Sequence, residues 1–153
     1  MIASIRSLYA QLERFPLPVL VLAFRIGVGM VFFKSALTKL DDAWMVSDSA
    51  IALFQDEYKV PLLPPRLAAQ LGTANEFFSS ILVMIGLATR PAAAALLGLV
   101  GVIQFLVYPG NWAEHLMWAS LLAYVLTRGP GPISLDYLLT QRLAQPTPAR
   151  RAA

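Results

Sequence analysis

The feature that most constrains this chain is a series of four apolar stretches, each near the length at which a helix crosses a bilayer. About twenty residues are needed, because a helix rises about 1.5 Å per residue and the hydrocarbon core is about 30 Å thick. The stretches cover residues about 17–37, 67–88, 92–108 and 112–127. The sequence therefore predicts an all-α, polytopic membrane protein, a four-helix transmembrane bundle that forms one domain over residues 1–140.

The composition agrees with a membrane environment and excludes several kinds of site. Of the 153 residues, 58% are apolar and only 14% are charged, whereas about a quarter are charged in an ordinary soluble domain. Twelve Lys and Arg against nine Asp and Glu give a net charge of +3, and the basic residues are scattered, so no nucleic-acid partner is expected. The absence of cysteine excludes disulfides, thiolate metal sites and iron–sulfur clusters.

A polar segment, residues 41–64, separates the first two apolar stretches. Trp44, Ile51, Leu53 and Phe54 have the spacing of a short amphipathic helix that lies along the membrane surface between helices 1 and 2. An irregular loop is the alternative for this segment.

The C-terminal part of the chain predicts a helix break and a new start. Residues 129–132 alternate glycine and proline, and Ser134 suits the N-cap of a further short helix. The polar residues 141–153 predict a flexible cytoplasmic tail.

The distribution of basic residues predicts the orientation, since Lys and Arg in short loops stay in the cytoplasm. With four spans both termini lie on one side, and that side holds seven basic residues against three on the other. We therefore expect both termini in the cytoplasm. The seven are Arg6, Arg14, Arg90, Arg128, Arg142, Arg150 and Arg151, and the three are Lys39, Lys59 and Arg66.

Two opposite charges lie inside the first two predicted spans. A charge in the middle of a span costs roughly 2.5–3.5 kcal/mol, so each needs a partner. Arg25 lies about 12 Å from the cytoplasmic start of its helix and Glu76 about 14 Å from the outer start of an oppositely directed helix. At these depths the two side chains meet near the midplane, and the sequence predicts an intramembrane ion pair between them. Its role is either to fix which helices pack together or to face a substrate.

A second group of polar and aromatic residues is expected nearer the outer surface. Gln104 and Tyr108 are four residues apart on the third helix, and His115 and Trp118 are three apart on the fourth. With Lys34 from the first helix they would form an outward-facing pocket above Glu76. Each residue also has an alternative role without a ligand. The alternatives are a belt at headgroup depth for the aromatic residues, a hydrogen bond at a helix end for the single histidine, and contacts with lipid phosphates for the lysine. One imidazole beside Glu114 is too little for a metal site, so no metal is expected.

The residues also resemble a known family, the DoxX family of small bacterial membrane proteins, from about Leu20 to Leu138. The resemblance lies in the order and spacing of five pieces: RIGVGMVFFKSALTKL, YKVPLLPPRLAAQLGTANE, GLATRPAA, VIQFLVYPGNWAEHLMWA and RGPGPISLD. It implies a four-helix transmembrane bundle in the inner membrane of a bacterium. The family-pattern positions that it carries over are Arg25, Gly29, Lys39, Glu76, Arg90, His115 and Asp136.

The resemblance implies two classes of function. The family is named for its similarity to a subunit of a thiosulfate:quinone oxidoreductase, and some members are linked to redox or oxidative-stress complexes. One hypothesis is therefore an accessory subunit of a membrane redox system that binds a quinone in the outward pocket. The other is a non-enzymatic membrane scaffold, or an accessory to metal or small-molecule transport. A protein partner from a redox or metal-handling system is expected in either case, and the sequence contains no self-contained catalytic constellation and no evident haem or flavin motif.

Overall fold

The regular secondary structure of this protein is entirely helical over the residues that its computed structural model describes, 14–144. Long helices occupy all four of the predicted stretches, and the second runs over Pro65–Ile85 rather than about 67–88. The elements are α2 (Leu17–Leu37), α3 (Asp48–Leu53), the π-helical turn η1 (Phe54–Tyr58), α4 (Pro65–Ile85), α5 (Thr89–Val102), the π-helical turn η2 (Ile103–Val107), α6 (Trp112–Arg128) and α7 (Leu135–Ala144).

Prolines and glycines set the helix boundaries. Both α2 and α4 have a proline in the first turn, where the missing N–H has no intrahelical partner to lose. α4 ends at Gly86, whose φ of 74° is left-handed and favours glycine. A Cβ at Gly86 would lie 2.5 Å from Cβ of Ser134 and 2.7 Å from Nη2 of Arg25. Only glycine therefore fits the tight turn between α4 and α5.

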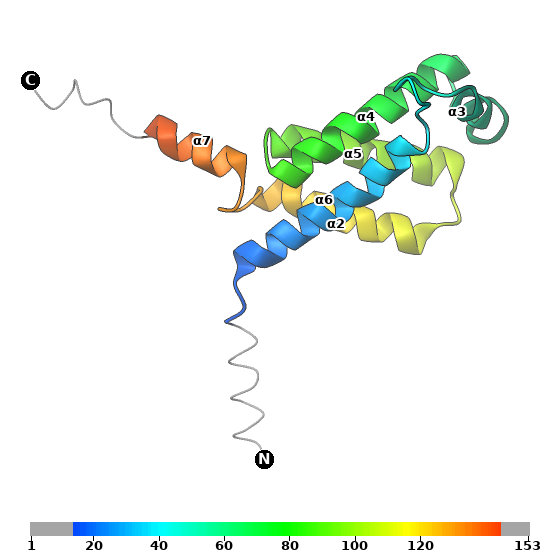
Figure 1. Cartoon of the computed structure of the whole chain (residues 1–153). Coiled ribbons are helices and arrows are strands. Elements are labelled where there is room, and N and C mark those ends of the chain that lie inside the picture. Colours follow the sequence, from blue (N-terminus) through cyan, green and yellow to red (C-terminus); the bar gives the residue numbers. More distant parts are fainter. Residues whose placement is uncertain (1–13, 145–153) are drawn as a thin grey trace, which may run out of the picture.

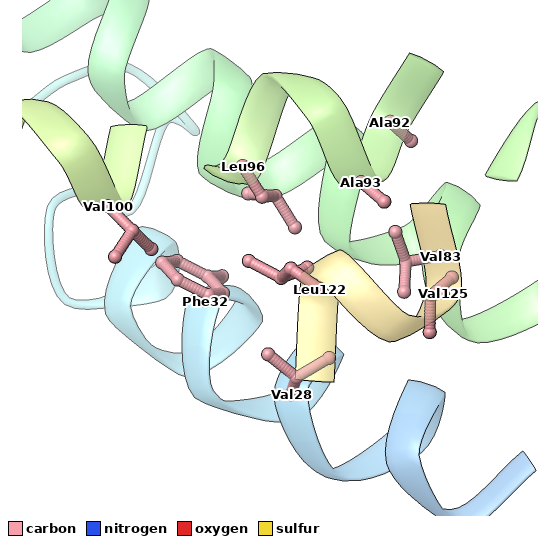
Figure 2. Packing of buried hydrophobic residues seen from close by; sticks show 9 residues of the cluster. All are labelled: Val28, Phe32, Val83, Ala92, Ala93, Leu96, Val100, Leu122 and Val125. Atoms are coloured by element: carbon pink, nitrogen blue, oxygen red, sulfur yellow. The ribbon is translucent and has the colours of Figure 1, made fainter. Parts of the chain in front are cut away.

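The helices α2, α4, α5 and α6 lie side by side in one bundle (Figure 1). We call the end that carries α3 and η1 the α3 end, and the end with the α4–α5 turn and α7 the α7 end. All four helices contribute to the apolar core, in which small side chains of α5 allow close approach (Figure 2). Its buried members are Val28, Phe32, Val83, Ala92, Ala93, Leu96, Val100, Leu122 and Val125.

Large apolar side chains also cover the outer surface of the bundle. Ile26, Phe78, Phe105 and Leu116, one from each long helix or its continuation, are all exposed. Contiguous exposed apolar surface of this kind marks an interaction with lipid or protein. By length and composition, α2 and the continuous helix Thr89–Val107 could each cross a membrane.

The helices α2 and α4 are antiparallel and are offset along their axes. Arg25 donates to the carbonyls of Val83 and Met84, and Gly29 lies beside the carbonyl of Ser80. If the ends of these two 21-residue helices were level, Arg25 would lie beside a residue of α4 about seven positions before those carbonyls. The offset is thus about 10 Å, or roughly two helical turns.

The segment between α2 and α4 forms a short cap at the α3 end. Phe54 is buried against Ala68 and Ala69 of α4, and its ring lies 3.2 Å from the position of a Cβ on Gly72. The predicted short helix is therefore present, and its best-buried aromatic side chain faces α4. Trp44 is a correction, because it precedes the helix in a turn with φ of 61° and is 67% exposed.

The last described helix, α7, begins where the sequence predicts. Oγ of Ser134 accepts a hydrogen bond from the backbone N of Tyr137 at 3.2 Å, as an N-cap does. α7 leaves the α7 end and runs across the direction of α2 and α4 (Figure 1). Residues 141–144 belong to α7, which corrects the predicted start of the tail at 141, and residues 145–153 lie outside the described residues.

Candidate ligand pocket in the helix bundle

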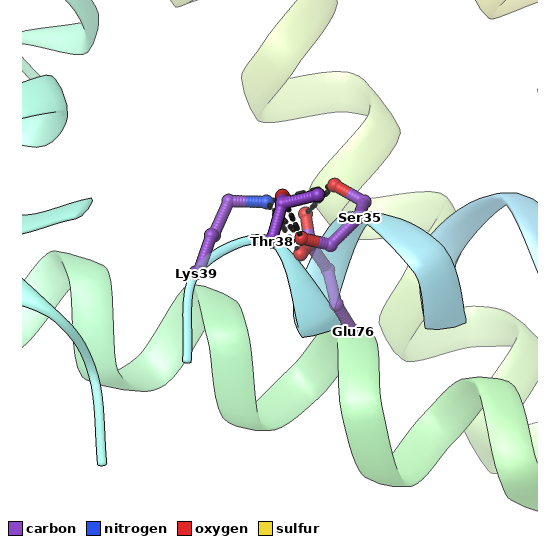
Figure 3. Close-up of polar contacts among 4 residues, drawn as sticks. All are labelled: Ser35, Thr38, Lys39 and Glu76. Carbon is purple, nitrogen blue, oxygen red and sulfur yellow. Dashed lines mark hydrogen bonds and ion pairs between the residues drawn. The ribbon is translucent and has the colours of Figure 1, made fainter. Parts of the chain in front are cut away.

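Lys39 and Glu76 form a buried ion pair toward the α3 end of the bundle (Figure 3). Nζ of Lys39 lies 2.7 Å from Oε2 of Glu76, and the two side chains are only 8% and 7% exposed. The hydroxyl of Ser35 accepts from Nζ at 2.7 Å and donates to Oε1 of Glu76 at 3.3 Å, while the Ser35 carbonyl accepts from Nζ at 3.2 Å. All three N–H donors of the ammonium group are therefore used.

This arrangement corrects the predicted ion pair between Arg25 and Glu76. Arg25 is 1% exposed, and the offset between α2 and α4 places its guanidinium at the last turn of α4. Carbonyls in that turn lack intrahelical partners and lie at the negative end of the helix dipole, so they suit a cation. Arg25 donates to the carbonyls of Val83, Met84, Pro130 and Ile133 at 2.7–2.9 Å, and it does not line the pocket described below.

The helical spacing of α2 explains why Lys39, and not Lys34, enters the interior. Buried residues recur every three or four positions along α2, and Lys39 is three beyond the last of them. Lys34 falls between two members of this series and is exposed, so the structure does not place it in the pocket as the sequence analysis expects. The series is Val21, Arg25, Val28, Gly29, Phe32 and Ala36.

His115 is buried in the first turns of α6 and is held through one ring nitrogen. Nε2 of Gln104 donates to the carbonyl of Pro109 at 2.9 Å, which turns the Gln104 amide oxygen toward His115. That oxygen lies 2.7 Å from Nδ1 of His115. Because an amide oxygen only accepts, Nδ1 carries the proton and donates. Nε2 makes no hydrogen bond to the part of the chain that the structure describes.

A cavity of about 190 Å³ lies between the four long helices at the α3 end, with mostly apolar walls. Tyr108, His115 and Trp118 line it, as the sequence predicts, and Glu76 lines it together with Lys39. The Trp118 ring packs 5.3 Å from the His115 ring, centroid to centroid. Gln104 does not line this cavity, and it contributes only by its hydrogen bond to His115. We call this cavity the bundle pocket.

The residues of η1 cover one side of the bundle pocket. Tyr58 lines the pocket, and its ring meets the Tyr108 ring edge to face at 5.7 Å. Burial raises the pKa of Tyr58, so its phenol stays neutral. The Tyr108 hydroxyl donates to the carboxylate of Glu57. This bond ties η1 to the residue that follows η2.

Other family-pattern positions lie at the α7 end, away from the pocket. The carboxylate of Asp136 accepts from the backbone N of Ala88 at 2.8 Å and from N and Oγ1 of Thr89 at 2.9 and 2.7 Å. Burial alone would raise the pKa of Asp136, but these bonds outweigh it and hold the pKa below its ordinary value. Arg90 is exposed and lies beside Gly129. Asp136 therefore caps α5 and docks α7.

Gly29 lies at a close contact between α2 and α4. A Cβ at this position would overlap the side chain of Met84 and lie 3.2 Å from the backbone oxygen of Ser80. The glycine therefore permits the helix contact that also brings Arg25 to the end of α4.

Sequence reasoning missed several polar residues of the pocket, among them Ser35, Tyr58 and Glu114. The first could have been found, because Ser35 is one helical turn before Lys39 and so shares its face. Tyr58 and Glu114 depend on how η1 and the start of α6 fold over the bundle, and no local pattern indicates that.

Comparison with known proteins assigns the family. The DoxX family model matches residues 20–109, which is more than half of the chain and includes most of α2 and all of α4, α5 and η2. The chain belongs to the DoxX family. DoxX proteins are membrane proteins, which agrees with the exposed apolar surface and with the two helices long enough to cross a membrane. Neither the curated proteins nor the solved structures contain a significant match to this DoxX chain.

Proposed function

We propose that this DoxX protein crosses the bacterial inner membrane four times, through α2, α4, α5 with η2, and α6. Exposed apolar side chains on each of these helices support the proposal. Both termini then lie in the cytoplasm, because the α7 end exposes more basic residues than the α3 end, which exposes Lys59 and Arg66 while its Lys39 is neutralised by Glu76. The described basic residues at the α7 end are Arg14, Arg90, Arg128 and Arg142.

The bundle pocket then opens toward the outer leaflet and binds the polar head of a quinone. The observation that carries this proposal is His115, whose Nδ1 is fixed by Gln104 while Nε2 is left to a ligand. With the proton on Nδ1, Nε2 accepts a hydrogen bond from a hydroxyl of the reduced quinone, the hydroquinone. The apolar walls and the Trp118 ring suit a planar ring. With about 190 Å³, the pocket is smaller than typical sites of roughly 300–1,000 Å³, so it takes a head group rather than a whole lipid-soluble molecule.

In this proposal the protein is an accessory subunit of a membrane redox system. A bound quinone supplies two-electron, two-proton chemistry. The chain's own residues bind the head, orient it through His115 and exclude water with η1 above the pocket. A protein partner exchanges the electrons.

The second candidate function is a non-enzymatic scaffold or transport accessory. The observation that favours it is the complete pairing of the buried charges. The Lys39 ammonium has three partners, and the Arg25 guanidinium makes four hydrogen bonds, so both could serve the fold alone. The two candidates differ in whether the free Nε2 of His115 receives a ligand.

Titration of purified protein in lipid nanodiscs with the reduced quinone, a hydroquinone whose hydroxyl can donate to Nε2 of His115, tests the proposal. Binding is followed by quenching of tryptophan fluorescence. His115→Asn is the informative variant, because its amide nitrogen replaces Nδ1 as the donor to Gln104 but nothing replaces Nε2. We expect about tenfold weaker binding, the value of one good hydrogen bond. Met117→Ala, an exposed neighbour that does not line the pocket, should bind like the wild type.

Two results would count against the proposal. One is no saturable quenching of the wild-type protein at any hydroquinone-to-lipid ratio. The other is equal binding by the wild type and His115→Asn, with both proteins equally folded by circular dichroism. Either result would favour the scaffold.

A further inference from the structure

A second cavity lies on the outer surface of the bundle, between η2 and the first turns of α6. It measures about 230 Å³, and its walls are almost wholly apolar. Phe105 from η2 and Trp112 from α6 both line it, with their rings edge to face at 5.9 Å. Both side chains are more than half exposed, so they form the outer rim of this groove. We call it the α5–α6 groove.

A glycine leaves the α5–α6 groove open on the α5 side. Gly101 lines the groove, and a Cβ there would meet nothing within 4 Å. Gly98, about one helical turn earlier on α5, has equally open surroundings but does not line the groove. The two positions therefore differ in location and not in how readily they accept a side chain.

The groove and the bundle pocket adjoin at His115, whose side chain lines both cavities. Gln104 and His115 line the groove, and His115 also lines the pocket, so this hydrogen-bonded pair is the boundary between the two cavities. The pair belongs to η2 and to α6, and neither side chain is held by a charge. The bundle pocket contains polar side chains, whereas the α5–α6 groove contains almost none.

We propose that the α5–α6 groove holds the apolar chain of the ligand whose polar head occupies the bundle pocket, an inference that rests on the proposed function. The occupant is the isoprenoid or alkyl chain of a lipid-soluble quinone. A molecule of this class has one polar ring and one long apolar chain, and the junction between them would lie at His115. The exposed rim formed by Phe105 and Trp112 faces the lipid, so the molecule enters sideways from the bilayer and not from water.

The length of the ligand chain provides the test. Two benzoquinones with the same ring are compared in their reduced form in nanodiscs, one with a methyl group and one with a ten-carbon chain, at matched concentrations in the bilayer. Gly101→Leu fills the groove, and Gly98→Leu is the matched control. We expect Gly101→Leu to bind the long-chain quinone about tenfold more weakly, the size of loss typical of overpacking, while binding of the methyl compound stays unchanged. Gly98→Leu should bind both compounds like the wild type.

The outcomes separate this inference from the proposed function. If the wild type binds neither quinone, the proposed function fails and the inference fails with it. If the wild type binds both but Gly101→Leu keeps its full affinity for the long-chain quinone, the inference alone is overturned and the groove holds an ordinary lipid chain. Equal weakening of both compounds by Gly101→Leu also overturns it, because the effect would then not depend on the chain.

Discussion

Removing one charge of the Lys39–Glu76 pair should destabilise the protein far more than removing both. Lys39→Met leaves a carboxylate that is 7% exposed, with only the Ser35 hydroxyl as a partner. At the observed separation of 2.7 Å, two unit charges attract by about 6 kcal/mol with an effective dielectric constant of about 20. The cost of desolvation offsets part of this attraction, and breaking a buried pair by removing one partner costs about 3–5 kcal/mol. We expect a loss in that range for Lys39→Met and a similar loss for Glu76→Leu.

A double-mutant cycle isolates the pair from the rest of the cluster. Lys39→Met with Glu76→Leu removes both charges and should come within about 1–2 kcal/mol of the wild type, because replacing a buried pair by apolar side chains is often close to neutral. The coupling energy should then be at least about 4 kcal/mol, the sum of the two single losses less that of the double variant. A cycle of Arg25→Gln with Glu76→Leu should be additive within about 0.5 kcal/mol, since Arg25 bonds only to carbonyls at the α7 end.

Reversible unfolding in mixed micelles provides the measurement. The detergent composition is titrated with sodium dodecyl sulfate, and helix content is followed by circular dichroism for each corner of both cycles. Coupling between Arg25 and Glu76 together with additivity for Lys39 and Glu76 would refute the register of α2 against α4 described above.

Three further predictions concern positions away from this pair. Gly86→Ala should lower the free energy of unfolding by more than about 2 kcal/mol, because it combines a left-handed φ with a Cβ 2.5 Å from its neighbour. Gly98→Ala, the control, should be neutral or stabilising by about 0.5–1 kcal/mol. Thermal unfolding compares the two variants. Asp136→Asn should lower stability by about 1–2 kcal/mol at pH 7 through the weakened cap on α5. Since the pKa of Asp136 is lowered on folding, that difference should be complete above its ordinary value of 3.8 and disappear as the pH falls through the folded-state pKa, as thermal unfolding at several pH values would show. Tyr108→Phe breaks the bond to Glu57, and hydrogen exchange in η1 should become faster with a global loss of no more than about 1.5 kcal/mol.

Much of the helical framework could be predicted from the sequence because its determinants are local. The bounds of α2 follow from the apolar run that begins near Pro16 and Pro18. The start of α7 follows from the glycine–proline break and from Ser134. In each case, propensity and backbone geometry act within a few residues of the boundary.

The partners of the buried charges could not be predicted in the same way. Comparing depths assumes that two antiparallel helices are level, and the offset of about 10 Å between α2 and α4 breaks that assumption. The offset depends on the close contact at Gly29 and on the backbone carbonyls that surround Arg25, which are tertiary features. The burial of Lys39 could have been predicted from the sequence, since Lys39 continues the spacing of the buried residues of α2, whereas Lys34 does not.

The central claim, that the bundle pocket receives the head of a quinone beside His115, is tested most directly by photolabelling. A benzoquinone with an azide on the ring is irradiated with the protein in nanodiscs, and the labelled residues are identified by mass spectrometry. The account predicts labels on pocket-lining residues such as Phe32, Ile103 and Trp118, and their suppression by excess unlabelled quinone. Labels confined to lipid-facing positions such as Phe78 and Leu71, unaffected by competitor, would contradict it.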